Sequence, residues 1–126
     1  MTLLDMRRSY SAKLKTERLI LDWGDSVAAA SLQSGYSQVE YQKQNQRVII
    51  SLAQTLNSKI ESQQISEKFK NDLYVKSAQL EFDPISQSQN LVLQLRKPMK
   101  LRVANYSGQI NQQNKTPARL VVDLVE

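Results

Sequence analysis

The chain repeats itself at a constant offset of 72 residues, and this internal duplication restricts its fold more than any other sequence feature. Two pairs of apolar stretches match at this offset: Arg18–Asp22 with Asn90–Gln94, and Arg47–Leu52 with Arg119–Leu124. The same register, extended backwards, places residues 3–11 over residues 75–83. Repetition of this kind indicates two equivalent halves, which we expect at about residues 1–53 and 73–126 of a single domain covering residues 1–126.

Each repeated stretch is typical of a β-strand of about five or six residues, because it opens on a polar residue and continues with Leu, Ile or Val. Side chains point alternately to the two faces of a strand, so every second residue shares one face. We therefore predict a mainly β fold, a sandwich of two symmetry-related small sheets. Strand parity predicts that its core contains Leu19, Leu21, Trp23, Val48, Ile50, Leu52, Leu91, Leu93, Leu95, Leu120, Val122 and Leu124.

One short helix is expected between the halves, within residues 54–72. The stretch Asn57–Lys70 contains no Gly or Pro, and apolar residues recur in it at near-helical spacing. Either Asn57 or Ser58 could cap the N-terminus of this helix. We expect the helix to lie over an end or an edge of the sandwich, where it would block an exposed strand from pairing with another chain.

The composition favours an anionic partner but argues against nucleic acid. Lys and Arg number 17 against 12 Asp and Glu, which gives a net charge of +5. A nucleic-acid binder concentrates its basic residues and interleaves aromatics, whereas here the basic residues are scattered and aromatics make up 6%. All apolar runs are too short to cross a bilayer, so we expect no membrane insertion.

Neither catalysis nor a cofactor is expected in this chain. It contains no Cys and no His, which removes the thiol nucleophile, the usual zinc ligands and the commonest general base. Its three Gly residues form no phosphate-binding loop. Neighbouring carboxylates such as Glu81 and Asp83 have no supporting signature, and ordinary surface acids account for them.

The strand faces opposite the predicted core carry the first group of candidate binding residues. The outward positions are occupied by Arg18 and Asp22 in one stretch, Arg47 in the next, and Arg119 and Asp123 in the last. A guanidinium makes paired, planar hydrogen bonds to carboxylates and phosphates, so the arginines suggest recognition surfaces. Solvated strands with good β-propensity would give the same pattern, and both interpretations remain open.

Tyrosines are the second group of candidate binding residues. Parity assigns Tyr41 to an outer face, and Tyr36, Tyr74 and Tyr106 could also stack against sugar rings. Gln and Asn side chains would then bond the sugar hydroxyls. For any single tyrosine, a half-buried sheet position is the simpler interpretation.

Five segments of the chain together point to a known family: Arg47–Asn57, Asp72–Ser77, Phe82–Pro84, Leu91–Leu95 and Pro117–Leu124. In this order and spacing they resemble the AMIN domain of Gram-negative N-acetylmuramoyl-L-alanine amidases. The resemblance runs from about Thr16 onward and is strongest in the second half. By motif position, it implies that Arg47, Arg119 and Asp123 belong to the outer sheet faces.

The resemblance implies a sandwich of two symmetry-related sheets that binds peptidoglycan and is not itself an enzyme. Such a domain is secreted to the periplasm and directs a linked zinc-dependent amidase to the division septum, where daughter cells separate. The zinc ligands would then belong to a catalytic domain that this chain does not contain. We expect a monomer, with divisome proteins as further partners. The first residues, Met1–Arg8, lack the apolar stretch of a secretory signal, so the chain is either cytosolic or has lost its signal peptide.

Two alternative functions stay open at this point. AMIN domains also occur in type IV pilus secretins, where they anchor an outer-membrane pore to the cell wall. A protein–protein adaptor of the divisome is an alternative of a different class, because a mixed outer face can receive a partner by strand addition or surface contact.

Overall fold

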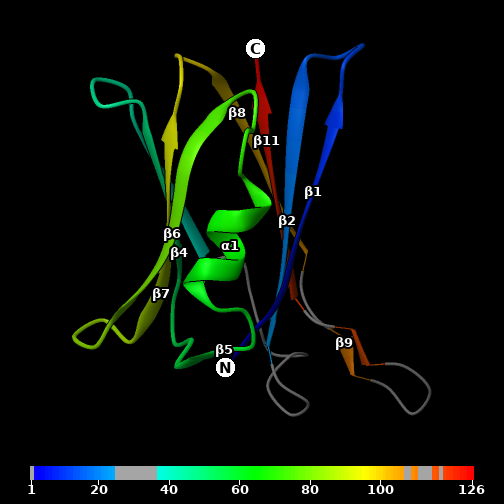
Figure 1. Cartoon of the computed structure of the whole chain (residues 1–126). Helices are drawn as coiled ribbons and strands as arrows, with labels where there is room; N and C mark the ends of the chain where they lie inside the picture. Colours follow the sequence, from blue (N-terminus) through cyan, green and yellow to red (C-terminus); the bar gives the residue numbers. More distant parts are fainter. Residues whose placement is uncertain (1, 25–36, 107–108, 111–114, 117) are drawn as a thin grey trace.

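The computed structural model describes residues 2–24, 37–106, 109–110, 115–116 and 118–126. Within these residues, two β-sheets face each other as the layers of a sandwich, and one short helix, α1 (Ser62–Lys68), lies at its side (Figure 1). The predicted fold class is therefore confirmed.

The two sheets are built from strands that are far apart in the sequence. The five-stranded sheet has the order β5-β1-β2-β11-β8, with bounds β1 (Thr2–Ser11), β2 (Thr16–Gly24), β5 (Asn57–Ser58), β8 (Lys100–Tyr106) and β11 (Ala118–Val125). The four-stranded sheet has the order β3-β4-β7-β6, with bounds β3 (Ser37–Gln42), β4 (Arg47–Leu52), β6 (Val75–Asp83) and β7 (Ser88–Leu95). A separate antiparallel ladder joins β9 (Gln109–Ile110) to β10 (Lys115–Thr116).

The duplication appears in the strand registers. β1, β2 and β4 recur about 72 residues later as β6, β7 and β11. The pairing recurs as well: Asp22 of β2 lies opposite Arg119 of β11, and Gln94 of β7 lies opposite Arg47 of β4. Each sheet therefore takes two strands from each half of the chain, so neither half completes a sheet alone.

A strand irregularity recurs at the same offset. The β1–β2 ladder shifts between Leu3 and Asp5, and the β6–β7 ladder shifts between Val75 and Ser77. A bulge of this kind places an extra residue in one strand and bends it locally. Because the bulge depends on local backbone geometry rather than on apolar parity, its recurrence is independent support for two equivalent halves.

The inner faces of both sheets form the hydrophobic core. Every residue that strand parity assigned to the core is at most 2% exposed, which confirms the assignment of the faces. The core also contains Met6 of β1 and two residues of the helical segment, Ile65 and Phe69. Burying each large apolar side chain contributes roughly 1.5–3 kcal/mol, so this layer holds the two sheets together.

The predicted helix between the halves is confirmed, but its predicted N-cap is wrong. Asn57 and Ser58 form β5, which pairs with the start of β1. The Ser58 hydroxyl bonds the backbone N–H and C=O of Ile60, so it is not free to cap a helix. Glu61 is the N-cap instead, and its backbone N–H donates to the side-chain oxygen of Gln64 at 2.9 Å.

Helix α1 seals the open edge of β6, as expected for a helix beside a sheet edge. The Ser62 hydroxyl accepts a hydrogen bond from the backbone N–H of Leu80 at 3.0 Å. The Ser66 hydroxyl donates to the backbone C=O of Ala78 at 2.6 Å. Since β6 is the last strand of its sheet, these serines satisfy backbone groups that another chain could otherwise pair with.

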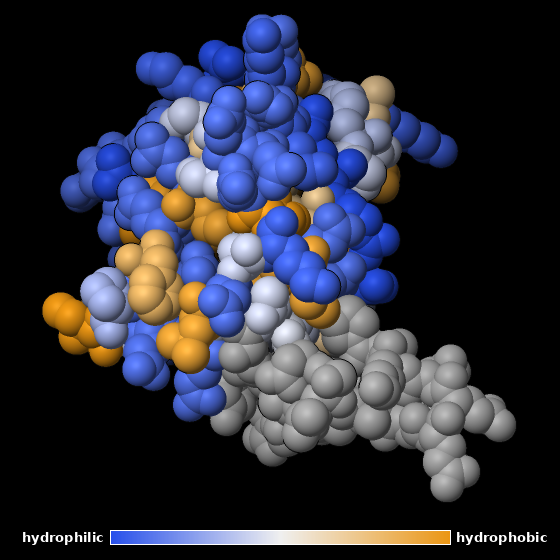
Figure 2. All heavy atoms as spheres, turned by 60° about the horizontal axis from the view of Figure 1, so that its bottom comes forward, coloured by the Kyte–Doolittle hydropathy of each residue, from blue (hydrophilic) through white to orange (hydrophobic). Residues whose placement is uncertain are grey.

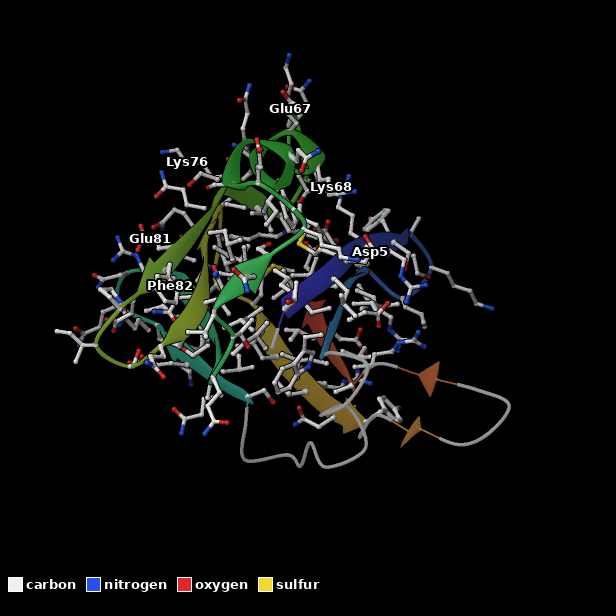
Figure 3. The ribbon with its side chains drawn as sticks, turned by 90° about the horizontal axis from the view of Figure 1, so that it is seen from below. Asp5, Glu67, Lys68, Lys76, Glu81 and Phe82 are labelled. Atoms are coloured by element: carbon white, nitrogen blue, oxygen red, sulfur yellow. The ribbon has the colours of Figure 1, made fainter. Side chains whose placement is uncertain are left out.

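The helix also fills the side of the sandwich between its two layers. Seen from below, α1 lies between β6, which carries Lys76 and Glu81, and β1, which carries Asp5 (Figure 3). Its Ile65 side chain is fully buried.

In the part of the chain that the structure describes, no helix is long and apolar enough to span a bilayer.

Candidate functional site

The outer face of the five-stranded sheet brings together most of the predicted binding residues. Arg18 and Asp22 project from β2, and Arg119 and Asp123 project from the neighbouring β11. Arg119 lies opposite Asp22 and Asp123 opposite Arg18, so opposite charges face each other across the strands. Strand parity therefore placed these residues on the correct face.

These residues form ion pairs with one another. Arg18 donates from Nε and Nη2 to the two carboxylate oxygens of Asp123 at 2.8 and 3.0 Å, and this pairing raises the pKa of Arg18. Asp22 accepts from Arg119 Nε at 2.8 Å and from Arg7 Nη2 at 3.1 Å. Arg18, Arg119 and their two aspartates, which we call the arginine ladder, are therefore paired across the strands. Arg102 of β8 lies on the same face opposite Asp123 and forms no ion pair among the described residues.

Arg47 lies on the outer face of the other sheet, as predicted, in a different environment. Its register neighbours are Gln42 of β3 and Gln94 of β7. Among the described residues, no carboxylate forms an ion pair with Arg47. Its guanidinium is therefore available to an external carboxylate.

The prediction that Tyr41 lies on an outer face is wrong. The β3–β4 register places Tyr41 opposite the buried Val48, so its ring points inward and packs against the core. Its hydroxyl accepts a hydrogen bond from the backbone N–H of Met99 at 3.1 Å. Tyr41 therefore joins β3 to the segment before β8 and is not a platform for a sugar ring.

The other tyrosines have different positions. Tyr74 is fully buried and its hydroxyl donates to Glu126 at 2.8 Å. Tyr106 lies opposite Arg119 at the end of β8 and is 58% exposed, so its ring is free for stacking. Tyr36 lies outside the described residues.

A field of uncharged polar side chains surrounds Arg47, and the reasoning from sequence missed it. The outward positions of the four-stranded sheet are rich in amides and hydroxyls, namely Gln38, Gln42, Ser51, Ser77, Gln79, Asn90 and Gln94. The half-buried Ile49 and Val92 lie between these polar side chains. Glu40 and Glu81 lie on the two edge strands of the sheet, β3 and β6. Applying strand parity to the polar residues, and not only to Arg and Tyr, would have found this face.

A buried ionic cluster lies on the inner side of the five-stranded sheet, also unpredicted. Arg8 Nη1 contacts Glu17 Oε1 and Asp72 Oδ1, both at 2.6 Å. Burial raises the pKa of Glu17 to about 7; the neighbouring carboxyl of Asp72 raises the pKa too, and Arg8 opposes the shift. Glu17 is fully buried, so this cluster can hold a proton but presents no carboxyl to a substrate. Within the described ranges, no group of three or more Asp, Glu, His or Cys side chains could hold a metal ion.

A scan against protein-family models found no match to this chain, and a search of curated proteins found none either. The candidate binding residues lie on the outer faces of the two sheets. The outer face of the five-stranded sheet carries the arginine ladder, in which Arg18 and Arg119 are paired with aspartates. The outer face of the four-stranded sheet carries amide and hydroxyl side chains together with the unpaired Arg47.

Proposed function

We propose that this domain is a non-catalytic peptidoglycan-binding module that acts through the outer face of its four-stranded sheet. Amide and hydroxyl side chains suit the hydroxyl and acetamido groups of a glycan strand. The guanidinium of Arg47 suits a carboxylate of a stem peptide, to which it can make paired hydrogen bonds. The observation that carries the proposal is this combination of an amide field and an unpaired cation on one exposed sheet face.

The resemblance to AMIN domains extends the proposal to the parent protein. The parent would be a zinc-dependent N-acetylmuramoyl-L-alanine amidase of the periplasm, with its zinc in a separate catalytic domain. The present domain would direct that enzyme to the division septum. Its many weak polar contacts suit a polymeric ligand, because repeated sites give useful avidity from modest individual affinities.

The arginine ladder of the five-stranded sheet is less suited than the face around Arg47 to bind peptidoglycan. Arg18 and Arg119 are already paired with Asp123 and Asp22. An external carboxylate would have to compete with these carboxylates, which are fixed at short distance on neighbouring strands. The proposal therefore assigns wall binding to Arg47 and assigns sheet stabilisation to the ladder.

Co-sedimentation with purified insoluble peptidoglycan tests the proposal. The wild-type domain is compared with Arg47→Glu and with Lys13→Glu, a matched charge reversal at an exposed residue of the β1–β2 turn. The wild type and Lys13→Glu are expected to pellet with the wall, and Arg47→Glu is expected to stay in the supernatant. Circular dichroism establishes that each variant is folded.

Two results would contradict the proposal. Failure of the folded wild type to sediment would remove wall binding altogether. An equal loss for Arg47→Glu and Lys13→Glu would show that binding follows net charge and not the face around Arg47.

A protein–protein adaptor of the divisome is the second candidate function. At the β6–β7 hairpin, Phe82 is 45% exposed and Ile85 is 95% exposed. Leu56, in the segment between β4 and β5, is 51% exposed. This segment contacts the hairpin through a hydrogen bond from the backbone N–H of Thr55 to the backbone C=O of Gln87. Figure 2 shows apolar side chains gathered at the hairpin end, at the left of the view. Exposed apolar clusters of this kind favour protein contacts. Replacing Ile85 with Ser should abolish partner binding in that case and leave wall sedimentation unchanged.

A further inference from the structure

We infer that a depression at the end of the amide-rich face is a subsite for a neutral saccharide unit, distinct from the carboxylate position at Arg47. This inference rests on the proposed function and specifies which chemical group of the polymer binds where. The depression has a volume of about 300 Å³ and is lined by Gln38, Ser51, Ala53, Asp83, Ser86, Ser88 and Asn90. That volume lies at the lower limit of small-molecule sites, which span about 300–1,000 Å³.

The depression exists because short side chains occupy the two central strands while longer ones surround them. Ser51 of β4 and Ser88 of β7 form its floor, and Ser88 is only 6% exposed. Gln38 reaches over from the edge strand β3, and Asp83 from the end of β6 opposite Ser88. The depression is therefore lined mainly by polar side chains, with Gln38 on the β3 side and Asp83 on the β6 side.

A chain of hydrogen bonds fixes the polar groups on one side of the depression. The hydroxyls of Ser86 and Ser88 are 2.6 Å apart, and Ser88 donates to the side-chain oxygen of Asn90 at 3.2 Å. This arrangement leaves the Asn90 amide nitrogen free to donate to a ligand oxygen. Asp83 Oδ1 accepts the backbone N–H of Ile85 at 3.0 Å, which lowers the pKa of Asp83 and keeps it ionised.

The lining selects an uncharged, hydroxyl-rich ligand. It contains a carboxylate, two amides and three hydroxyls, and no Lys or Arg. A stem-peptide carboxylate would be repelled by Asp83 and would find no cation to pair with. Sugar hydroxyls, which both donate and accept, can bond to Asp83 as donors and to Asn90 and Gln38 as donors or acceptors.

The position of the depression relative to Arg47 fits one polymer at both places. Ser51 and Arg47 are on the same face of β4 and four residues apart, which is about 13 Å at the usual rise of a strand. A glycan strand that places a sugar in the depression can therefore direct a peptide substituent towards Arg47. The two positions recognise different groups of the same molecule.

An NMR titration of the isotope-labelled domain tests the inference with a soluble neutral probe, the tetramer of β-1,4-linked N-acetylglucosamine. We expect chemical-shift changes centred on the amides of Ser51, Ala53, Ser88 and Asn90. Asn90→Ala should raise the dissociation constant about tenfold, or about 1.4 kcal/mol. Gln63→Ala, at an exposed amide of α1 and away from the outer face of the four-stranded sheet, is the control and should bind as the wild type does.

Gln38→Ala is a second variant at an exposed side chain of an edge strand, so its fold should not depend on the change. It too should weaken tetramer binding. The inference is overturned if the tetramer causes no shift changes, if the changes centre on the arginine ladder, or if both depression variants bind as the wild type does. Wall sedimentation of the wild type in those cases would leave the proposed function standing, whereas tetramer binding without wall sedimentation would overturn the proposed function alone.

Discussion

Replacing the buried Glu17 with Gln should strongly change how the unfolding free energy depends on pH between about pH 4 and pH 8.5. The pKa of Glu17 is raised from 4.5 to about 7, first by burial and then by the neighbouring carboxyl of Asp72. A raised pKa in the folded state means that the folded chain holds the proton more tightly than the unfolded chain does. The protonated group therefore stabilises the fold fully below about pH 4.5, and that contribution is lost as the pH rises through about 7.

The size of the effect follows from the two pKa values. The difference between 4.5 and about 7 corresponds to about 3 kcal/mol of unfolding free energy, lost between those pH values. Glutamine keeps the shape of the protonated side chain and cannot ionise. The stability of Glu17→Gln relative to the wild type should therefore rise by about 3 kcal/mol from about pH 4 to about pH 8.5. Titrating groups that do not contact Glu17 are shared by both proteins and cancel in this comparison, so the measured difference reports on Glu17 together with Asp72 and Arg8.

Urea unfolding followed by circular dichroism at both pH values measures this difference directly. Glu67→Gln is the matched control, because it makes the same chemical change at an exposed residue of α1. The control should show a much smaller change between the two pH values. An equal stability gap for Glu17→Gln at both pH values would refute the assignment of the raised pKa to the buried cluster around Arg8.

Two further predictions concern the sheet edges and faces. Ser62→Ala removes the acceptor for the backbone N–H of Leu80. The substitution should lower the unfolding free energy by about 1 kcal/mol and accelerate hydrogen exchange at the Leu80 amide. An unchanged exchange rate at Leu80 would show that another contact protects this edge of β6. Arg18→Ala removes the paired hydrogen bonds to Asp123, so it should lower the urea midpoint at low salt, and this difference should shrink in about 1 M NaCl; a salt-independent difference would mean that packing of the Arg18 side chain dominates.

The two layers and the core of this fold could be predicted because both follow from the alternation of apolar and polar residues within each strand. Alternation along a strand assigns a face to each residue, and the repeat supplied the same alternation at β2, β4, β7 and β11. Arg18, Asp22, Arg119 and Asp123 followed from the same parity. Their pairing with each other could not be predicted, since it depends on which strands are neighbours and on their register.

The errors arose where the chain gives weak local signals. Tyr41 belongs to β3, where Gln38, Glu40 and Gln42 alternate with Val39 and Tyr41, and the inward face becomes clear only from the pairing with β4. The buried cluster joins Arg8, Glu17 and Asp72 from three separate segments, and no periodicity relates such positions. Contacts of this kind are set by tertiary packing alone.

The exchange of strands between the two halves determines when this domain can begin to fold during synthesis. Asp22 in β2 and Arg119 in β11 are 97 residues apart in the chain, yet they are direct neighbours in the five-stranded sheet. On the ribosome, β1 and β2 emerge as a hairpin in which the free side of β2 has no partner until β11 has been made. Long-range pairing of this kind slows folding and leaves strand edges exposed in the meantime, so we expect the nascent domain to bind holdase chaperones until β11 has emerged.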